Sequence, residues 1–217
     1  MALHKLIMAH TYSNRILLYR MNELQIKFAR WISVIGHPFL LMPVLTGIIA
    51  YHILPPHDAL IAELVALGVV IIPAGVYTIV RVRRGTWGDL DVSNQRERTQ
   101  FYSILLPLLF VLALIALLAH VPRSVPLGSF AIIVLVGTGS IINKWIKISL
   151  HTAFGVFVAF TLYLIHPRTA AIAFVLACLV AWSRVVLKRH TPGEVLLGAL
   201  LGSAVGAGFI ASLYYLT

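Results

Sequence analysis

The sequence predicts an all-α fold, a polytopic membrane bundle of about seven transmembrane helices with an N-terminal amphipathic helix. Hydrophobic residues make up 60% of the 217 residues and charged residues only 11%, whereas an ordinary soluble domain carries about 25% charged residues. Several apolar runs approach the roughly 20 residues that a helix needs to cross the hydrocarbon core. The sequence also lacks long alternation of apolar and polar residues, so a membrane barrel is not expected.

The candidate spans are separated by short polar breaks. They lie near residues 31–53, 59–80, 102–120, 128–146, 151–166, 169–187 and 194–216. Residues 1–30 mix apolar and basic residues and are too polar for the core of a signal peptide. We expect them to form an amphipathic segment on the membrane surface, with their cations at the lipid headgroups. The chain is thus divided into an interfacial segment, residues 1–30, and a membrane-embedded domain, residues 31–217.

The basic charge of the chain predicts its orientation rather than a nucleic-acid partner. The formal net charge is +10, and in membrane proteins such an excess marks cytoplasmic loops and anionic headgroups. Apart from Arg123 and Arg168, every Lys and Arg falls in the N-terminal segment or in breaks that the helix count places on the same side. The positive-inside rule puts this side in the cytoplasm of a cell inner or plasma membrane.

Three polar breaks on that side carry complementary chemistry. "DVSNQRER" contributes Arg96 and Arg98, "KISLH" contributes Lys147, Ser149 and His151, and "SRVVLKRHTPGE" contributes Arg184, His190 and Glu194. Arginine offers a planar fork that matches phosphate oxygens. Ser149 is well placed to cap the helix that begins near His151, and the free N–H groups and dipole of this helix favour an anion. One histidine can attack phosphorus while the other protonates the departing alkoxide. No metal or other cofactor is needed if the cations neutralise the developing charge.

These breaks resemble the signatures of the type 2 phosphatidic acid phosphatase superfamily. "SRVVLKRHTPGE" matches the third signature, SRxxxxxHxxxD, at Ser183, Arg184 and His190, with Glu194 at the aspartate position. "ISLH" resembles the second signature, PSGH, at two positions, and "DVSNQRERT" resembles the first, KxxxxxxRP, at Arg98 only. The resemblance covers about residues 91–194 and implies a membrane lipid phosphatase.

The resemblance also implies residue roles. His190 would be the nucleophile that forms a phosphohistidine, Glu194 would orient it, and His151 would act as general acid and then as base. Arg98, Arg184 and Ser149 would hold the phosphate, with Arg96 as a further candidate. Asp91 stands where the family has lysine and would repel phosphate, so Lys147 is the candidate replacement cation. Other departures are Thr99 and Ile148 for prolines and Leu150 for glycine.

Other interpretations remain open at this point. Thr191 to Glu194 is a helix-start pattern, so Glu194 could serve in a capping box alone. Asp89 and Asp91 suggest a Mg²⁺-dependent prenyl or alcohol-phosphate transferase, although a second acidic loop is not evident. A third alternative is a non-catalytic lipid-binding member of the same fold. The remaining histidines near span ends are interpreted as interfacial, namely His37, His52, His57, His120 and His166.

Overall fold

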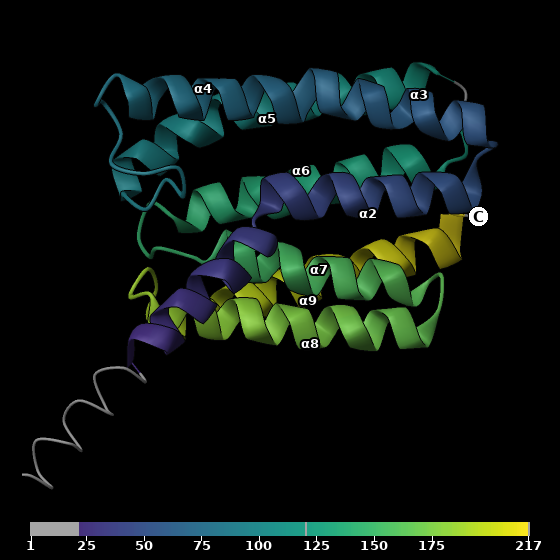
Figure 1. Ribbon diagram of the computed structural model, residues 1–217. Helices are drawn as coiled ribbons and strands as arrows, with labels where there is room; N and C mark the ends of the chain where they lie inside the picture. Colours follow the sequence, from purple (N-terminus) through teal and green to yellow (C-terminus); the bar gives the residue numbers. More distant parts are fainter. Residues whose placement is uncertain (1–21, 120, 217) are drawn as a thin grey trace, which may run out of the picture.

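The computed structural model describes residues 22–119 and 121–216, and all regular elements within these ranges are helical. Most of the predicted amphipathic segment, residues 1–21, lies outside the described residues. The helices are Asn22–Ile35, α2 (Pro38–Ile53), α3 (Pro56–Ala66), the π-helical turn η1 (Leu67–Ile71), α4 (Ile72–Arg83), α5 (Gln95–Leu118), α6 (Ser124–Ile142), α7 (Leu150–Tyr163), α8 (Pro167–Val186) and α9 (Pro192–Leu216). Figure 1 shows α2 to α9 packed side by side with their long axes roughly aligned.

The prediction of an all-α fold is confirmed for the described residues, and it includes helices that could span a membrane. Five described helices are long and apolar enough to span a membrane, with α3, η1 and α4 counted as one. A sixth results if Asn22–Ile35 and α2 form one bent span. The predicted span at residues 151–166 corresponds to α7, which has only 14 residues. At a rise of 1.5 Å per residue it is about 21 Å long, shorter than the ~30 Å hydrocarbon core. The count of seven therefore stays a prediction.

The first predicted span is not one straight helix. The helices Asn22–Ile35 and Pro38–Ile53 meet at an angle of 47°, because Gly36 and Pro38 interrupt the chain at this point. Proline has no N–H for a continuing helix but suits the first position of a new one. His37 lies in the break and caps α2, since its Nδ1 accepts a hydrogen bond of 3.2 Å from the Phe39 amide. The bend places a histidine where an unbroken apolar span was expected.

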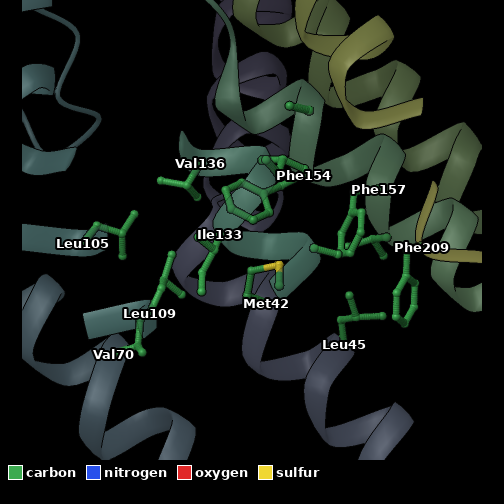
Figure 2. Close-up of a cluster of buried hydrophobic side chains, with 14 of the residues drawn as sticks. Met42, Leu45, Val70, Leu105, Leu109, Ile133, Val136, Phe154, Phe157 and Phe209 are labelled. Atoms are coloured by element: carbon green, nitrogen blue, oxygen red, sulfur yellow. The ribbon is translucent and has the colours of Figure 1, made fainter. Parts of the chain in front are cut away.

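Helix α7 lies in the middle of the bundle. It packs against α2, α8 and α9, and most of its side chains are buried. Figure 2 shows its Phe154 and Phe157 within the largest apolar cluster, which draws other members from α2, η1, α5, α6 and α9. Protein rather than lipid therefore surrounds α7, which explains how a helix too short to span alone is accommodated.

Small residues set the distance between α7 and α9. Gly198, Gly202 and Gly206 recur at every fourth position of α9 and face α7. A Cβ atom at Gly198 would collide with the Ser149 carbonyl oxygen, and one at Gly202 with the carbonyl oxygen of Ala153. The close approach that these glycines allow brings the first turns of α7 and α9 together.

The three polar breaks lie at the same end of the bundle. They form the α4–α5, α6–α7 and α8–α9 connections, which gather at the left of Figure 1. Side-chain bonds join them: Gln95 Nε2 donates to the Asn143 carbonyl, and Arg189 Nη1 donates to Asp89 Oδ2 at 2.6 Å. This arrangement agrees with the prediction that the breaks emerge on one side.

Candidate active site

The α8–α9 connection holds His190 in a fixed orientation. The amides of Arg189 and His190 both donate to the carbonyl of Arg184, at 3.0 and 3.2 Å, which folds the chain back at the end of α8. His190 Nδ1 lies 2.7 Å from Glu194 Oε2, and the His190 side chain is 1% exposed. With the Nδ1 proton donated to this carboxylate, the lone pair of the neutral ring resides on Nε2.

Glu194 also completes a capping box at the start of α9. Its backbone N–H donates to Thr191 Oγ1, and its Oε2 accepts from the Thr191 N–H, each at 3.3 Å. The same carboxylate oxygen therefore caps the helix and binds His190. The two interpretations of Glu194 in the sequence are compatible, because one side chain does both.

The surroundings of His190 keep its ring uncharged. Burial lowers its pKa to about 2, and the positive charges of Arg98, Arg184 and Lys147 act in the same direction. These cations come from all three polar breaks. A ring with such a pKa is neutral at pH 7 and has a lone pair available for nucleophilic attack.

Arg184 is 0% exposed and is only partly paired. Its Nη1 donates to Ser33 Oγ at 2.6 Å and to Asp91 Oδ2 at 2.8 Å. Its Nε and Nη2 have no hydrogen-bond partner among the described residues. These two nitrogens form one edge of the guanidinium group, and two parallel N–H groups on such an edge suit two oxygens of one phosphate. A buried arginine with this edge unpaired can bind an anion without breaking its existing hydrogen bonds.

Arg98 connects the first break to the second. Its side chain is buried in the first turn of α5, where Nε donates to the Val92 carbonyl and Nη1 to the Ile148 carbonyl. Val92 has a φ of 49°, which is unusual for a β-branched residue. This backbone strain turns the Val92 carbonyl toward Arg98, and strain of this kind often accompanies functional sites.

Ser149 and Lys147 join the second break to the third. Ser149 caps α7 through the Thr152 amide, and its own amide donates to the Glu194 carbonyl at 3.2 Å. Lys147 Nζ donates to the Arg189 carbonyl at 2.7 Å. Burial lowers the Lys147 pKa, as do the charges of Arg98, Arg184 and Arg189. Lys147 therefore belongs to the same cluster of cations as the two buried arginines.

His151 lies in the first turn of α7 beside Asp91. It is 6% exposed, and its Nε2 has no hydrogen-bond partner among the described residues. This atom lies 3.9 Å from Asp91 Oδ1, and His37 Nε2 lies 3.7 Å from the same oxygen. The rings of His37 and His151 are perpendicular, with centroids 4.8 Å apart. One carboxylate oxygen is thus flanked by two imidazoles.

The sequence interpretation missed His37 and Ser33. His37 was placed among interfacial histidines, whereas the bend before α2 brings it against His151. Gly36-His37-Pro38 interrupts an otherwise apolar run, and this breaker pattern was the available signal. Ser33 has no comparable signal, because its contact with Arg184 joins positions 151 residues apart.

Asp91 has a different environment from the one expected. The sequence suggested that its charge would repel a bound phosphate, but the ion pair with Arg184 offsets that charge. Because the pair uses Nη1, the Nε–Nη2 edge is still unpaired. The carboxylate therefore orients the arginine without occupying its phosphate-binding edge.

Comparison with known proteins found a family model that matches the C-terminal part of the chain. The family model of the PAP2 superfamily matches residues 140–217. The match shows that this part of the chain is similar to the PAP2 superfamily. The matched residues include the second and third breaks, so the match confirms their resemblance to the signatures of this superfamily. No match was found among curated proteins or among solved structures.

Two residues that the sequence offered as site candidates lie away from the buried cluster. Arg96 is exposed on the first turn of α5, where its backbone amide donates to the N-cap Asn94. Asp89 pairs with Arg189 at 2.6 Å and accepts from the Ser93 amide at 3.2 Å. Since Asp89 and Asp91 bind different arginines, the structure gives no support to a shared Mg²⁺ site on these two carboxylates.

An apolar cavity of about 110 Å³ opens next to the polar cluster. Its polar end is lined by His37, Asp91, Arg98 and His151, all near the ends of helices. Its walls are mostly apolar side chains, such as Met42, Val70, Leu109 and Phe154, and the hydrogen-bonded pair of Thr46 and Glu63 also lines it. The cavity therefore joins a polar end beside the buried cluster to a largely apolar space between the helices.

Proposed function

We propose that the protein is an integral membrane lipid phosphatase that works through a phosphohistidine on His190. The observation that carries this proposal is the pairing of His190 Nδ1 with Glu194 Oε2 at 2.7 Å beside a fully buried Arg184 with one unpaired edge. A neutral, oriented imidazole next to unused phosphate donors is the arrangement that phosphoryl transfer to histidine needs.

The phosphate group would be held mainly by fixed cations. Arg184 offers its Nε–Nη2 edge, while Arg98 and Lys147 supply further positive charge within reach of His190. The first turn of α7 after Ser149 adds free N–H groups and the positive end of the helix dipole. Arg96 is left out of these contacts because its side chain is exposed. These donors neutralise the equatorial oxygens without a metal ion.

The reaction would follow two displacements. In the first, His190 Nε2 attacks phosphorus, the bond to the lipid oxygen breaks, and His151 gives its proton to the departing alkoxide. In the second, a water molecule loses a proton to His151 and attacks the phosphohistidine. The P–N bond breaks, inorganic phosphate forms, and both histidines return to their starting states. Glu194 keeps the Nδ1 proton of His190 in place throughout.

The apolar cavity supports a lipid substrate. A chain lying among Met42, Leu109 and Phe154 would leave its phosphate beside Arg98 and His151 at the polar end. The tail could be acyl or polyprenyl, and the terminal group a phosphate or a pyrophosphate. By the distribution of Lys and Arg, the site would face the cytoplasm and act on an intermediate made inside the cell.

A phosphate-release screen tests the proposal. Detergent-purified protein is offered phosphatidic acid, lyso-lipid phosphates and polyprenyl mono- and diphosphates, with and without EDTA. We expect release by the wild type in both conditions and by the control His57→Ala, and none by His190→Ala. Radiolabel from the substrate should be trapped on His190 after acid-free quenching.

Three results would contradict the proposal. Phosphate release by His190→Ala would exclude His190 as the nucleophile. Loss of release in EDTA would favour metal-dependent chemistry. Binding of lipid phosphates without release of any would favour a non-catalytic member of the fold.

A further inference from the structure

Three potential metal ligands meet at the polar end of the cavity. They are His37 from the bend before α2, Asp91 from the α4–α5 connection and His151 from α7. One ligand atom of each lies within 4.8 Å of the other two. The closest approaches are 3.7 Å from Asp91 Oδ1 to His37 Nε2 and 3.9 Å to His151 Nε2. Neither distance is a hydrogen bond, so the three atoms surround a point without bonding one another.

These separations are close to those of a tetrahedral metal site. Zinc ligands of the nitrogen and oxygen type lie about 2.0–2.2 Å from the ion, which puts ligand atoms about 3.4 Å apart. The two distances to Asp91 Oδ1, 3.7 and 3.9 Å, are within about 0.5 Å of that spacing. The three ligand atoms lie within 4.8 Å of one another, so the two imidazoles would approach each other by up to about 1.4 Å on coordination. Two imidazoles with one carboxylate suit Zn²⁺ and similar transition metals, whereas Mg²⁺ and Ca²⁺ prefer oxygen ligands.

A second observation points to a ligand at the same place. His151 is 6% exposed, and its Nε2 is a buried polar atom with no partner in the described part of the chain. Buried polar atoms are seldom left unsatisfied, and each that is calls for an explanation. This atom is one of the three ligand atoms.

The neighbours of the cluster would support coordination. Asp91 Oδ2 is held by Arg184 Nη1, which also bonds Ser33, so the other carboxylate oxygen is oriented toward the two histidines. Such outer-shell bonds commonly fix metal ligands. His37 offers the Nε2 lone pair when its proton lies on Nδ1, which replaces the 3.2 Å hydrogen bond from the Phe39 amide. That neutral hydrogen bond is the one interaction the site gives up.

We propose that His37, Asp91 and His151 bind one divalent transition-metal cation such as Zn²⁺, and that this binding inhibits hydrolysis. The inhibition rests on the proposed function, in which His151 carries the proton. An imidazole with a cation on Nε2 keeps its only proton on Nδ1 and has no lone pair left for another. Such an imidazole neither gives nor takes a proton near neutral pH. The leaving alkoxide therefore loses its proton donor, and the attacking water loses its proton acceptor.

Cobalt titration tests the binding site by itself. The full chain is purified in detergent without a histidine tag, stripped with chelator, and titrated with Co²⁺, whose visible absorption reports low-coordinate nitrogen and oxygen ligation. We expect one Co²⁺ per chain, displaced by Zn²⁺ and not by Mg²⁺. The test variant is His37→Asn, because asparagine still caps α2 but lacks the Nε2 ligand.

The matched control is His57→Asn. His57 also lies next to a carboxylate, with Nδ1 3.4 Å from Asp58 Oδ1, but no third ligand joins it among the described residues. We expect His37→Asn to weaken Co²⁺ binding at least tenfold, since loss of an outer-shell partner alone costs ~10–100-fold. Equal Co²⁺ binding by the wild type and His37→Asn would contradict the proposed cation site. No Co²⁺ binding by the wild type would contradict it as well.

Hydrolysis tests the regulatory part. Added Zn²⁺ should suppress phosphate release by the wild type, EDTA should restore it, and His37→Asn should need at least tenfold more Zn²⁺ for the same relative inhibition. Binding of Zn²⁺ that leaves release unchanged would overturn the inhibitory role. If no lipid phosphate is hydrolysed at all, the proposed function and the inhibition fail together, while the cobalt titration still decides the cation site.

Discussion

Asp91 Oδ2 accepts a 2.8 Å hydrogen bond from Arg184 Nη1, and the opposite edge of the same guanidinium group has no partner in the described part of the chain. This relationship joins the residue that departs most from the family pattern to the residue best placed to bind phosphate. Asp91 thereby combines two effects, because it holds a buried cation in position and offsets one positive charge near the site.

Asp91→Asn should destabilise the protein more than Asp89→Asn does. Arg184 is 0% exposed, and removal of one partner of a buried ion pair costs about 3 kcal/mol or more. Arg189, the partner of Asp89, is 38% exposed, and such a surface pair is worth about 1 kcal/mol or less. The midpoint of thermal unfolding in detergent measures both variants. Equal shifts would show that the buried pair contributes no more than the exposed one.

Glu194→Gln should slow phosphate release without loosening α9. Glutamine can still take part in the capping box with Thr191, but it removes the negative charge beside His190 Nδ1. We expect release to fall by up to about 10⁴-fold, because the amide no longer holds the Nδ1 proton and the orientation of the ring, with the unfolding temperature nearly unchanged. A variant with wild-type release would mean that Glu194 serves α9 alone.

Gly198→Ala should disturb the site through helix packing. The new Cβ would meet the Ser149 carbonyl oxygen at the start of α7, and overpacking of this kind costs about 1–3 kcal/mol. Gly208→Ala is the control in the same helix, because no atom lies within 4 Å of its Cβ position. That substitution should be neutral or stabilising by up to ~1 kcal/mol. Thermal unfolding and phosphate release should both separate the two variants.

The stability of the protein should fall as the pH drops below 6.5. The pKa of His190 is lowered to about 2 by burial and by nearby cations, whereas an unfolded histidine titrates near 6.5. Between these values the unfolded chain binds a proton that the folded chain does not, so the free energy of unfolding rises with pH across this window. The slope from this group is at most about 1.4 kcal/mol per pH unit. His190→Gln should show a shallower dependence between pH 6.5 and 5 in thermal unfolding, and an unchanged slope would count against a neutral buried ring.

The site should face the cytoplasm. Labelling with a membrane-impermeant maleimide tests this in a background where the single cysteine, Cys178, is replaced by alanine. Lys144→Cys reports the α6–α7 connection at the site end, and Arg168→Cys reports the exposed start of α8 at the other end. In intact cells we expect labelling at position 168 only, and labelling at position 144 instead would reverse the orientation.

The sequence by itself determined the all-helical class of the protein and pointed to the family that its third break resembles. Composition and apolar run length require helices in lipid, because backbone groups there must bond within their own segment. The short spacing from Arg184 to His190 and Glu194 also predicted local chemistry, since a turn followed by one helical turn brings these side chains together. The predicted count of seven spans is less secure, because α7 is sheltered by its neighbours and need not span alone.

Only the tertiary structure decided the environment of Asp91. Its partners are Arg184, 93 residues away, and the imidazoles of His37 and His151. Such contacts depend on the bend at Gly36–Pro38 and on the close packing of α7 against α9. No local sequence pattern predicts these contacts. They arise from how separate helices pack against one another and not from the order of residues along any one helix.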